Sequence, residues 1–168
     1  MHATKAIKTN LFEGFHPNSK VWIYVSDRII SKDESQRINH QLEVFTKQWT
    51  AHDKALRGAG GVFYDRFIVL TVDELVTNAS GCSIDKSVHF IKQIEIEYNL
   101  NLFDRMTFFY QTDETIKSFH FNDLINLVKS GEIIESTKIF DTTITQLGLF
   151  QSEFIKEVGK TWLAKFFK

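Results

Sequence analysis

The sequence predicts an α+β protein with a ferredoxin-like β-α-β-β-α-β core, an antiparallel sheet, and a C-terminal extension built from a β-hairpin and helices. Runs rich in β-branched and aromatic residues, typical of strands, occur at 20–27, 62–74 and 106–112. Two segments with a helical spacing of apolar residues separate these runs. This order of elements is that of the split βαβ motif, in which both helices cover one face of the sheet.

The first strand and helix have the clearest signals. "KVWIYVSD" at 20–27 is β-branched and aromatic, which predicts a strand. "SKDE" then places Ser31 at an N-cap with Glu34 three residues later, a capping box. The predicted helix ends near His52, and its apolar face is formed by Ile38, Leu42, Phe45 and Trp49.

The middle of the chain predicts a pair of strands and a second helix. "LRGAGG" is expected to be a glycine-rich connection. "VFYDRFIVLTVDE" then supplies one short and one longer strand, with Asp65 and Arg66 at the turn. The second helix is expected from about 83 to 99. Its inner face is expected to consist of Ile84, Val88, Ile91, Ile94 or Glu95, and Tyr98.

The last third predicts the extension. "MTFFYQT" and "TIKSFHF" flank a turn and form a hairpin, and "NDLINLVKSG" forms a short helix that ends at Gly131. A strand at "TKIFD" and a C-terminal helix from about 151 to 167 complete it. Residues 1–19 are expected to be a loosely ordered arm, and 20–168 a single domain.

Composition limits the class of protein. Twenty basic and 21 acidic residues give a net charge of −1, so binding to nucleic acid or to an anionic membrane is not expected. The single cysteine excludes an internal disulfide and fits a reducing compartment. No apolar run approaches the length of a membrane span, and the first residues lack a signal-peptide core. A cytoplasmic protein is expected.

Several stretches, taken in order, resemble a known family. They are "VWIYVSDR", "WTAHDKAL", "YDRFIVLTVDE", "ASGCSIDKSVHFIK" and "FDR", with "TWLAKFF" near the end. In these stretches the chain is similar to a group of small, uncharacterised bacterial proteins that are often described as ABC transporter ATPases. The resemblance covers roughly residues 20 to 110 and the C-terminal tryptophan segment. It implies ATP hydrolysis only through that description.

The residues themselves argue against ATP hydrolysis. An ABC ATPase holds the nucleotide phosphates with a loop of the pattern G-x-x-x-x-G-K-[ST]. "RGAGGVF" has the glycines but lacks the lysine and the hydroxyl residue that must follow, and "ASGCS" only faintly resembles the ABC signature loop. No nucleotide cofactor is expected.

The segment "SGCSID" is the first candidate site. Cys82 stands near a predicted helix start, where the dipole and free N–H groups activate a thiol. One hypothesis is therefore an enzyme with Cys82 as nucleophile and His52 as base. The favoured interpretation is structural: Ser80, Gly81 and Ser83 form the turn and cap, and Cys82 is a small buried filler.

The same segment is also a candidate binding site without thiol chemistry. Hydroxyls and N–H groups at a helix start bind anions, so a small anionic ligand or a protein partner is expected in a polar pocket. Its residues would be Ser80, Gly81, Ser83 and Asp85, with Asp73, Glu74 and Trp49 converging on them. Asp73 and Glu74 point to opposite strand faces, and one of them is expected to bond the helix start rather than a metal. The six histidines show no metal-binding spacing, so no metal site is expected.

The aromatic residues give the last expectation. The rings of "MTFFYQ" and "SFHF" could stack nucleic-acid bases, but no basic-aromatic motif accompanies them, so a buried face or a homodimer interface is favoured. The last helix alternates lysines with apolar residues and is expected to dock on the sheet or on a partner subunit. The leading hypothesis is a non-catalytic binding or interaction module, and the Cys82 enzyme and an ATPase are the alternatives.

Overall fold

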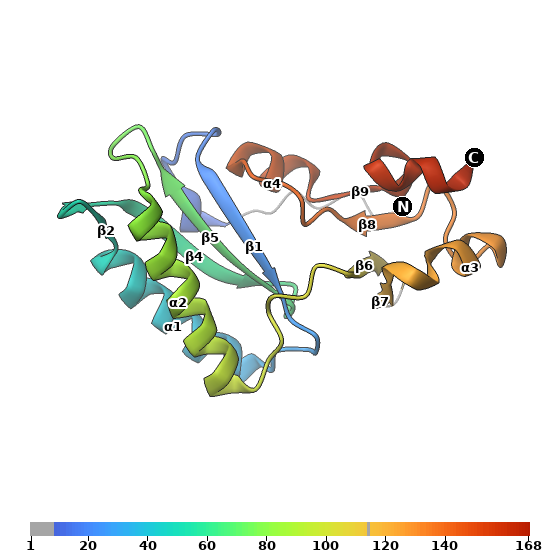
Figure 1. Cartoon of the computed structure of the whole chain (residues 1–168), viewed down its shortest axis with the longest axis horizontal. Helices are drawn as coiled ribbons and strands as arrows, with labels where there is room; N and C mark the ends of the chain where they lie inside the picture. The colour runs from blue at the N-terminus through green and yellow to red at the C-terminus, as the bar shows by residue number, and fades with distance from the viewer. Residues whose placement is uncertain (1–8, 114) are drawn as a thin grey trace.

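The fold is known from a computed structural model that describes residues 9–113 and 115–168 (Figure 1). Three long strands, β1 (Lys20–Val25), β4 (Arg57–Phe63) and β5 (Phe67–Asp73), form an antiparallel sheet in the order β1-β5-β4. A second antiparallel sheet has the order β7-β6-β8-β9. Its strands are β6 (Thr107–Gln111), β7 (Ile116–His120), β8 (Lys138–Phe140) and β9 (Ile155–Glu157). The predicted α+β class with antiparallel pairing is confirmed.

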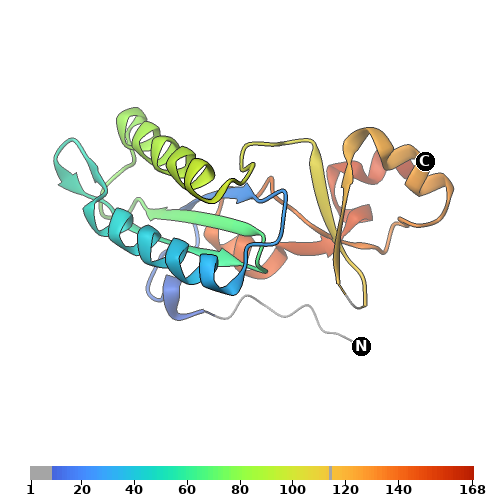
Figure 2. The ribbon, with the colours of Figure 1, turned by 90° about the horizontal axis from the view of Figure 1, so that it is seen from below.

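Two helices cover one face of the first sheet. α1 (Lys32–Gln48) and α2 (Gly81–Tyr98) lie side by side on it in both views (Figures 1 and 2). Their inner residues pack against β-strand side chains in one apolar cluster, which includes Ile38, Leu42, Ile91, Ile94 and Ile68. Both predicted amphipathic helices are thus confirmed, but α1 ends at Gln48 rather than near His52. In the first half of α2 the buried positions are Ser83 and Ser87, whereas Ile84 and Val88, predicted to face inward, are only partly buried.

The capping box predicted for α1 is also present. The Ser31 hydroxyl accepts a hydrogen bond from the N–H of Glu34, whose carboxylate accepts one from the N–H of Ser31. The Arg28 guanidinium donates to both oxygens of the Glu34 carboxylate, and with the N–H of Ser31 it lowers the pKa of that group to about 2. Arg28 also donates to the carbonyl of Tyr98, at the end of α2. One side-chain cluster therefore joins the start of α1 to the end of α2.

The opposite face of the first sheet is covered by aromatic rings. Phe67 of β5 is fully buried, and its ring centroid lies 5.7 Å from Phe109, 4.9 Å from Phe140 and 5.0 Å from Phe154. These three rings belong to β6, β8 and the residue before β9, so the cluster joins the two sheets. The 3-10 helix η1 (Asn10–Phe12) and α4 (Leu147–Glu153) add Phe12, Leu147 and Phe150 to it.

The sixth predicted element does not complete a ferredoxin-like sheet. β6 pairs with β7 and β8 instead of with β1. The start of the β1 edge is covered by the segment that leads into α4, since the N–H of Val21 donates to the carbonyl of Thr145 and the N–H of Leu147 donates to the carbonyl of Ser19. The hairpin of β6 and β7 and the strand at β8 are confirmed, but the ferredoxin-like topology is not.

Three local expectations need correction. Residues 57–61 of the supposed glycine-rich connection belong to β4, because pairing with β5 along the whole strand outweighs the weak strand preference of glycine. The C-terminal helix over 151–167 is wrong: α4 ends at Glu153, β9 pairs with β8, and short 3-10 helices, η3 (Val158–Lys160) and η4 (Trp162–Phe167), follow. Of the N-terminal arm, residues 1–8 lie outside the described residues, while Phe12 is buried.

The remaining elements are short. Trp49 caps α1, and β2 (Thr50–Ala51) and β3 (Lys54–Ala55) form a tight hairpin whose turn residues, His52 and Asp53, have positive φ. A 3-10 turn, η2 (Phe121–Asp123), leads into α3 (Leu124–Lys129). Within the described part of the chain, no helix is both long and apolar enough to cross a lipid bilayer.

Candidate functional site

The serines of "SGCSID" use their hydroxyls to cap α2. Ser80 is the N-cap: its hydroxyl accepts from the N–H of Ser83 at 3.2 Å, and the Ser83 hydroxyl accepts from the N–H of Ser80 at 2.8 Å. The Ser83 hydroxyl also donates to the Ser80 carbonyl, and Ser83 is fully buried. The predicted cap is therefore present, and both hydroxyls have partners within the turn.

Trp49 is a core residue rather than part of a pocket wall. Its side chain is 2% exposed and packs with Ala51, Leu56 and Val72. Its ring N–H donates to the carbonyl of Ser83 at 2.8 Å. Trp49 thereby supports the start of α2 from below, as a buried indole N–H that has found a partner.

Asp73 and Glu74 point in different directions, as strand alternation predicts. Glu74 accepts from the N–H of Ala79, next to the N-cap of α2, and pairs with Lys20 at 3.1 Å. Asp73 is buried, accepts from the N–H of His16 and lies 3.6 Å from the Arg57 guanidinium. The expected bond from one of them near the helix start is confirmed for Glu74. The structure does not bring the two carboxylates together.

Cys82 is not a buried filler. Its side chain is exposed at the first turn of α2, because Ser83 takes the inward position of that turn. His52 is exposed as well, at the tip of the β2-β3 hairpin. Among the described residues, no hydrogen bond joins the Cys82 thiol to His52 or any other side chain, and no group of three potential metal ligands occurs. Asp85 is also exposed on this turn.

We therefore expect Cys82 to be accessible but not activated by His52. A small alkylating reagent should label the native protein fully at about pH 7.5, at the rate of an unassisted exposed thiol. His52→Ala should change that rate by less than about twofold, because no contact transmits the change. Mass spectrometry of timed samples measures both rates. Labelling that requires denaturation, or that slows tenfold in His52→Ala, would contradict this expectation.

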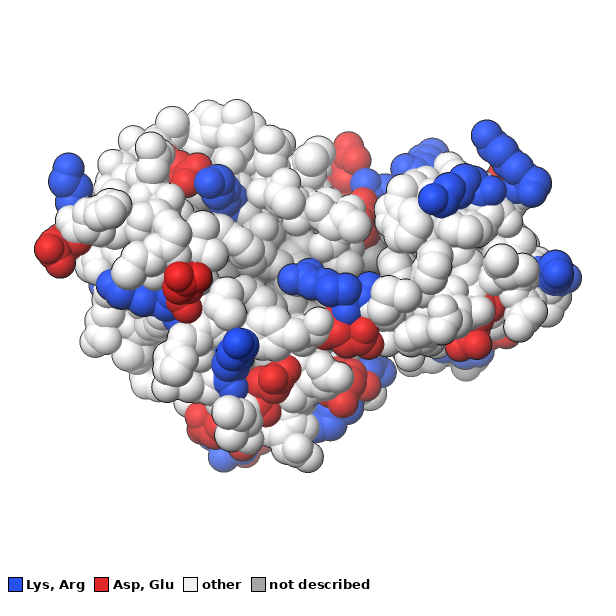
Figure 3. All heavy atoms as spheres, in the orientation of Figure 1, with Lys and Arg blue, Asp and Glu red and all other residues white. Residues whose placement is uncertain are grey.

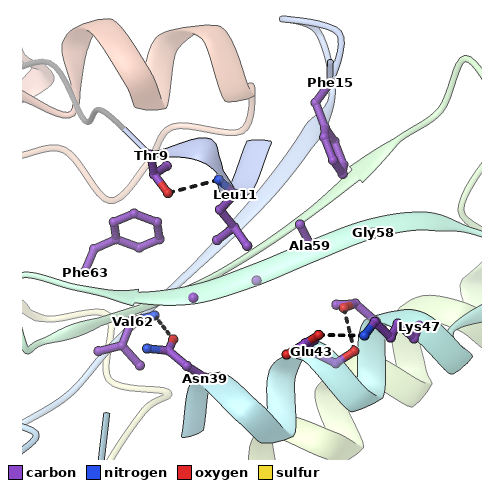
Figure 4. A pocket seen from close by; sticks show the side chains of 13 residues that line it. Thr9, Leu11, Phe15, Asn39, Glu43, Lys47, Gly58, Ala59, Val62 and Phe63 are labelled. Carbon is purple, nitrogen blue, oxygen red and sulfur yellow. Dashed lines mark hydrogen bonds and ion pairs between the residues drawn. The ribbon is translucent and has the colours of Figure 1, made fainter. Parts of the chain in front are cut away.

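A groove lies elsewhere, along β4. This groove has a volume of about 480 Å³ and runs between α1 on one side and η1 with the residues after it on the other (Figure 4). Its floor is the glycine-rich strand at 58–63. Its α1 wall consists of Asn39, Glu43, Thr46 and Lys47, and its other wall of Thr9, Leu11 and Phe15.

The floor of the groove is an open strand edge. β4 pairs with β5 on one side only, so every second residue turns its backbone N–H and C=O away from β5. Val62 is one of these, because its N–H donates to the Asn39 side-chain oxygen at 2.8 Å. Gly58 and Gly60 alternate with Val62 along the strand, so their backbone groups point in the same direction as those of Val62. Their N–H and C=O groups therefore point away from β5 and toward the groove, where no described residue bonds them; Gly58 is partly exposed, whereas Gly60 is buried.

The two walls differ in chemistry. On α1, Lys47 donates to the Glu43 carboxylate at 2.6 Å and lowers its pKa, so the wall holds one acid and one base that neutralise each other. On the other wall, Leu11 and the Phe15 ring are apolar. On the face shown in Figure 3, basic side chains also stand beside acidic ones in several places. The groove thus has a polar side, an apolar side and a hydrogen-bonding floor.

Comparisons with protein-family models, with curated proteins and with solved structures find no match for this chain. The chemistry of the groove is therefore inferred from its own residues. No histidine or cysteine lines it, and its single carboxylate is paired with Lys47. The lining therefore consists of apolar side chains, two threonine hydroxyls, one side-chain amide and one ion pair around a backbone floor.

The sequence-based interpretation missed this groove. The glycines of "RGAGG" suggested a flexible connection, although glycine in a strand also marks close approach of another backbone. The following Val62 and Phe63, and the turn before Phe67, were the signals of a hairpin. The aromatic residues of the later hairpin lie mostly inside the chain, since Phe109, Tyr110 and Phe119 are buried. The homodimer through this aromatic surface stays a prediction.

Proposed function

We propose that the protein is a non-catalytic binding module that takes up an extended polypeptide strand at the open edge of β4. The observation that carries the proposal is the pair of outward-facing backbones at Gly58 and Gly60, on the floor of an open groove. An unpaired edge is a template for another strand, and peptide-binding proteins use it by adding the ligand to their sheet. The other edge of this sheet, at β1, is bonded by residues 145–147 at its N-terminal end, around Ser19 to Val21.

The absence of side chains at the floor favours backbone recognition. A Cβ at Gly60 would lie 2.8 Å from Leu70 Cδ2 and 3.0 Å from the carbonyl of Val69, so this position accepts only glycine without rearrangement. A Cβ at Gly58 would lie 3.0 Å from the Trp49 ring. Because no side chains project there, an incoming backbone can reach the N–H and C=O groups of β4 directly.

The alternative functions have weaker support. The glycines of "RGAGG" lie inside a strand, whereas a phosphate-binding loop joins a strand to a helix. The Cys82 enzyme lacks contact with its supposed base, and the serines of the predicted anion pocket already bond each other. A binding module remains the function that the arrangement supports best.

Peptide binding tests the proposal. We expect an acetylated, amidated peptide of alternating threonine and valine, seven residues long, to bind saturably with a dissociation constant between about 10 µM and 1 mM. Fluorescence anisotropy of a labelled copy measures it. Methylating the backbone nitrogens of the third and fifth residues, which removes donors toward β4, should weaken binding at least about tenfold. Equal binding of both peptides would contradict strand addition.

A matched protein control separates the groove from the "SGCSID" segment. Asp85→Ala changes an exposed side chain at the start of α2, outside the groove lining. It should leave the dissociation constant within about twofold of the parent protein. Loss of peptide binding in Asp85→Ala would place the site at α2 instead of β4.

A further inference from the structure

We infer that the β4 groove selects strands that alternate apolar and polar residues, run antiparallel to β4, and carry a basic residue two positions before an acidic one. This inference rests on the proposed function, because it describes the occupant of the same strand edge. It follows from the two faces of β4 and from the order of charges on α1.

The faces of β4 determine which ligand side chains meet which wall. Cβ atoms added at Gly58 and Gly60 would point at Trp49 and Leu42, on the helix side of the sheet. A Cβ added at Gly61 would point the other way, 2.9 Å from Leu11 Cδ2. Directly opposite residues of paired strands share a face. Ligand residues opposite Gly58 and Gly60 therefore face α1, and those opposite 59 and 61 face Leu11 and Phe15.

The apolar wall specifies hydrophobic ligand residues. Leu11 is 39% exposed, and Ala59 and Gly61 offer little side-chain bulk beside it. A valine or leucine opposite residue 61 would cover Leu11 and fill the space that the missing Gly61 side chain leaves. A polar residue in that place would lose its hydration against an apolar surface. The ligand positions that face this wall are thus apolar at every second residue.

The side chains of the polar wall are spaced nearly as far apart along α1 as alternate residues are along β4. Asn39, Glu43 and Lys47 are spaced four residues apart on α1, which corresponds to a rise of about 6 Å per step. Two strand residues span about 6.8 Å. The hydrogen bond from Val62 to Asn39 fixes the start of this register. This spacing places Glu43 beside Gly60 and Lys47 beside Gly58, and all four residues line the groove. Figure 4 shows Glu43 and Lys47 on α1, following Asn39 along the groove.

Charge complementarity then specifies the polar positions. The ligand residue opposite Gly60 meets the Glu43 carboxylate, so it is basic, and the residue opposite Gly58 meets Lys47, so it is acidic. Antiparallel pairing gives perpendicular, slightly more stable hydrogen bonds than parallel pairing. In an antiparallel ligand the residue opposite Gly60 precedes the one opposite Gly58. The order is therefore basic, any residue, acidic.

Two peptides of identical composition test this inference. In Thr-Val-Lys-Val-Glu-Val-Thr the charges follow the inferred order, and in Thr-Val-Glu-Val-Lys-Val-Thr they are reversed. We expect the first to bind about fivefold more tightly at low salt, a ratio that falls toward one near 0.5 M NaCl because the pairs are exposed. A third peptide, with the same residues but its three valines consecutive, should bind at least about tenfold more weakly than the first.

A charge-swapped protein supplies the matched control. The double substitution Glu43→Lys and Lys47→Glu keeps an ion pair four residues apart on α1 but reverses its direction. It should bind the reversed peptide more tightly, which would support the inference. Unchanged preference in this variant, or equal binding of both charged peptides to the parent protein, would overturn the charge rule. If the uncharged threonine-valine peptide still binds in that case, strand addition stands. If no peptide binds, the proposed function itself fails.

Discussion

Phe67→Ala is expected to lower the free energy of unfolding by about 3–5 kcal/mol. Phe67 has no exposed surface, and its ring contacts aromatic residues from both sheets. Removing it leaves a cavity between the sheets and ends the edge-to-face contacts with Phe109 and Phe154. Urea unfolding, followed by tryptophan fluorescence and by circular dichroism, measures the change.

Two further variants control this prediction. Phe67→Leu keeps most of the buried volume, so it should cost less than about 1.5 kcal/mol. Trp162→Ala removes a ring that is 46% exposed in η4, and it should cost less than half as much as Phe67→Ala. A loss below about 1 kcal/mol for Phe67→Ala would show that the aromatic cluster does not hold the two sheets together.

Local signals in the sequence predicted the first sheet and its helices well. The strand at β1, the hairpin turn at Asp65, the capping box at Ser31 and the cap at Ser80 all depend on residues close in the chain. Hydrophobic periodicity identified the buried side of α1 and of the second half of α2 because that side faces a single sheet. It missed the buried serines, Ser83 and Ser87, in the first half of α2. Such features are encoded within a few residues of where they appear.

The partner of a strand is not encoded in this way. The residue types of β6 are compatible with pairing to β1 and also with pairing to β7 and β8. In the structure β6 pairs with β7 and β8, and its Phe109 packs against Phe67 of β5. The C-terminal segment shows the same limit. Its lysines and apolar residues fit a helix, but pairing of Ile155 with Phe140 and an ion pair between Lys156 and Asp141 favour a strand.

The candidate site depended on such non-local facts. The residue types of "SGCSID" predicted a site there, but in the structure the hydroxyls of its two serines cap α2. The groove at β4 contains ordinary residues and glycines, and it exists only because β4 lies at a sheet edge between α1 and η1. No residue type marks an edge strand. The site therefore required the order of the strands.

In the proposed complex, a peptide covers the strand edge formed by the backbones of Gly58 and Gly60. Amide hydrogen exchange, read residue by residue from two-dimensional NMR spectra, observes these groups directly. In the free protein we expect the amides of Gly58 and Gly60 to exchange at least about 100 times faster than those of Ala59 and Gly61, which donate to β5.

Adding the threonine-valine peptide at saturation should decide the claim. We expect exchange at Gly58 and Gly60 to slow at least about tenfold, while Ala59 and Gly61 change little, because only the outward-facing amides gain partners. Slow exchange of Gly58 and Gly60 already in the free protein would contradict an open edge. Protection that depends on protein concentration would show that a second copy covers the edge. Protection that does not depend on concentration would show that the chain covers its own edge. Unchanged exchange at both glycines with peptide bound would also contradict strand addition at β4.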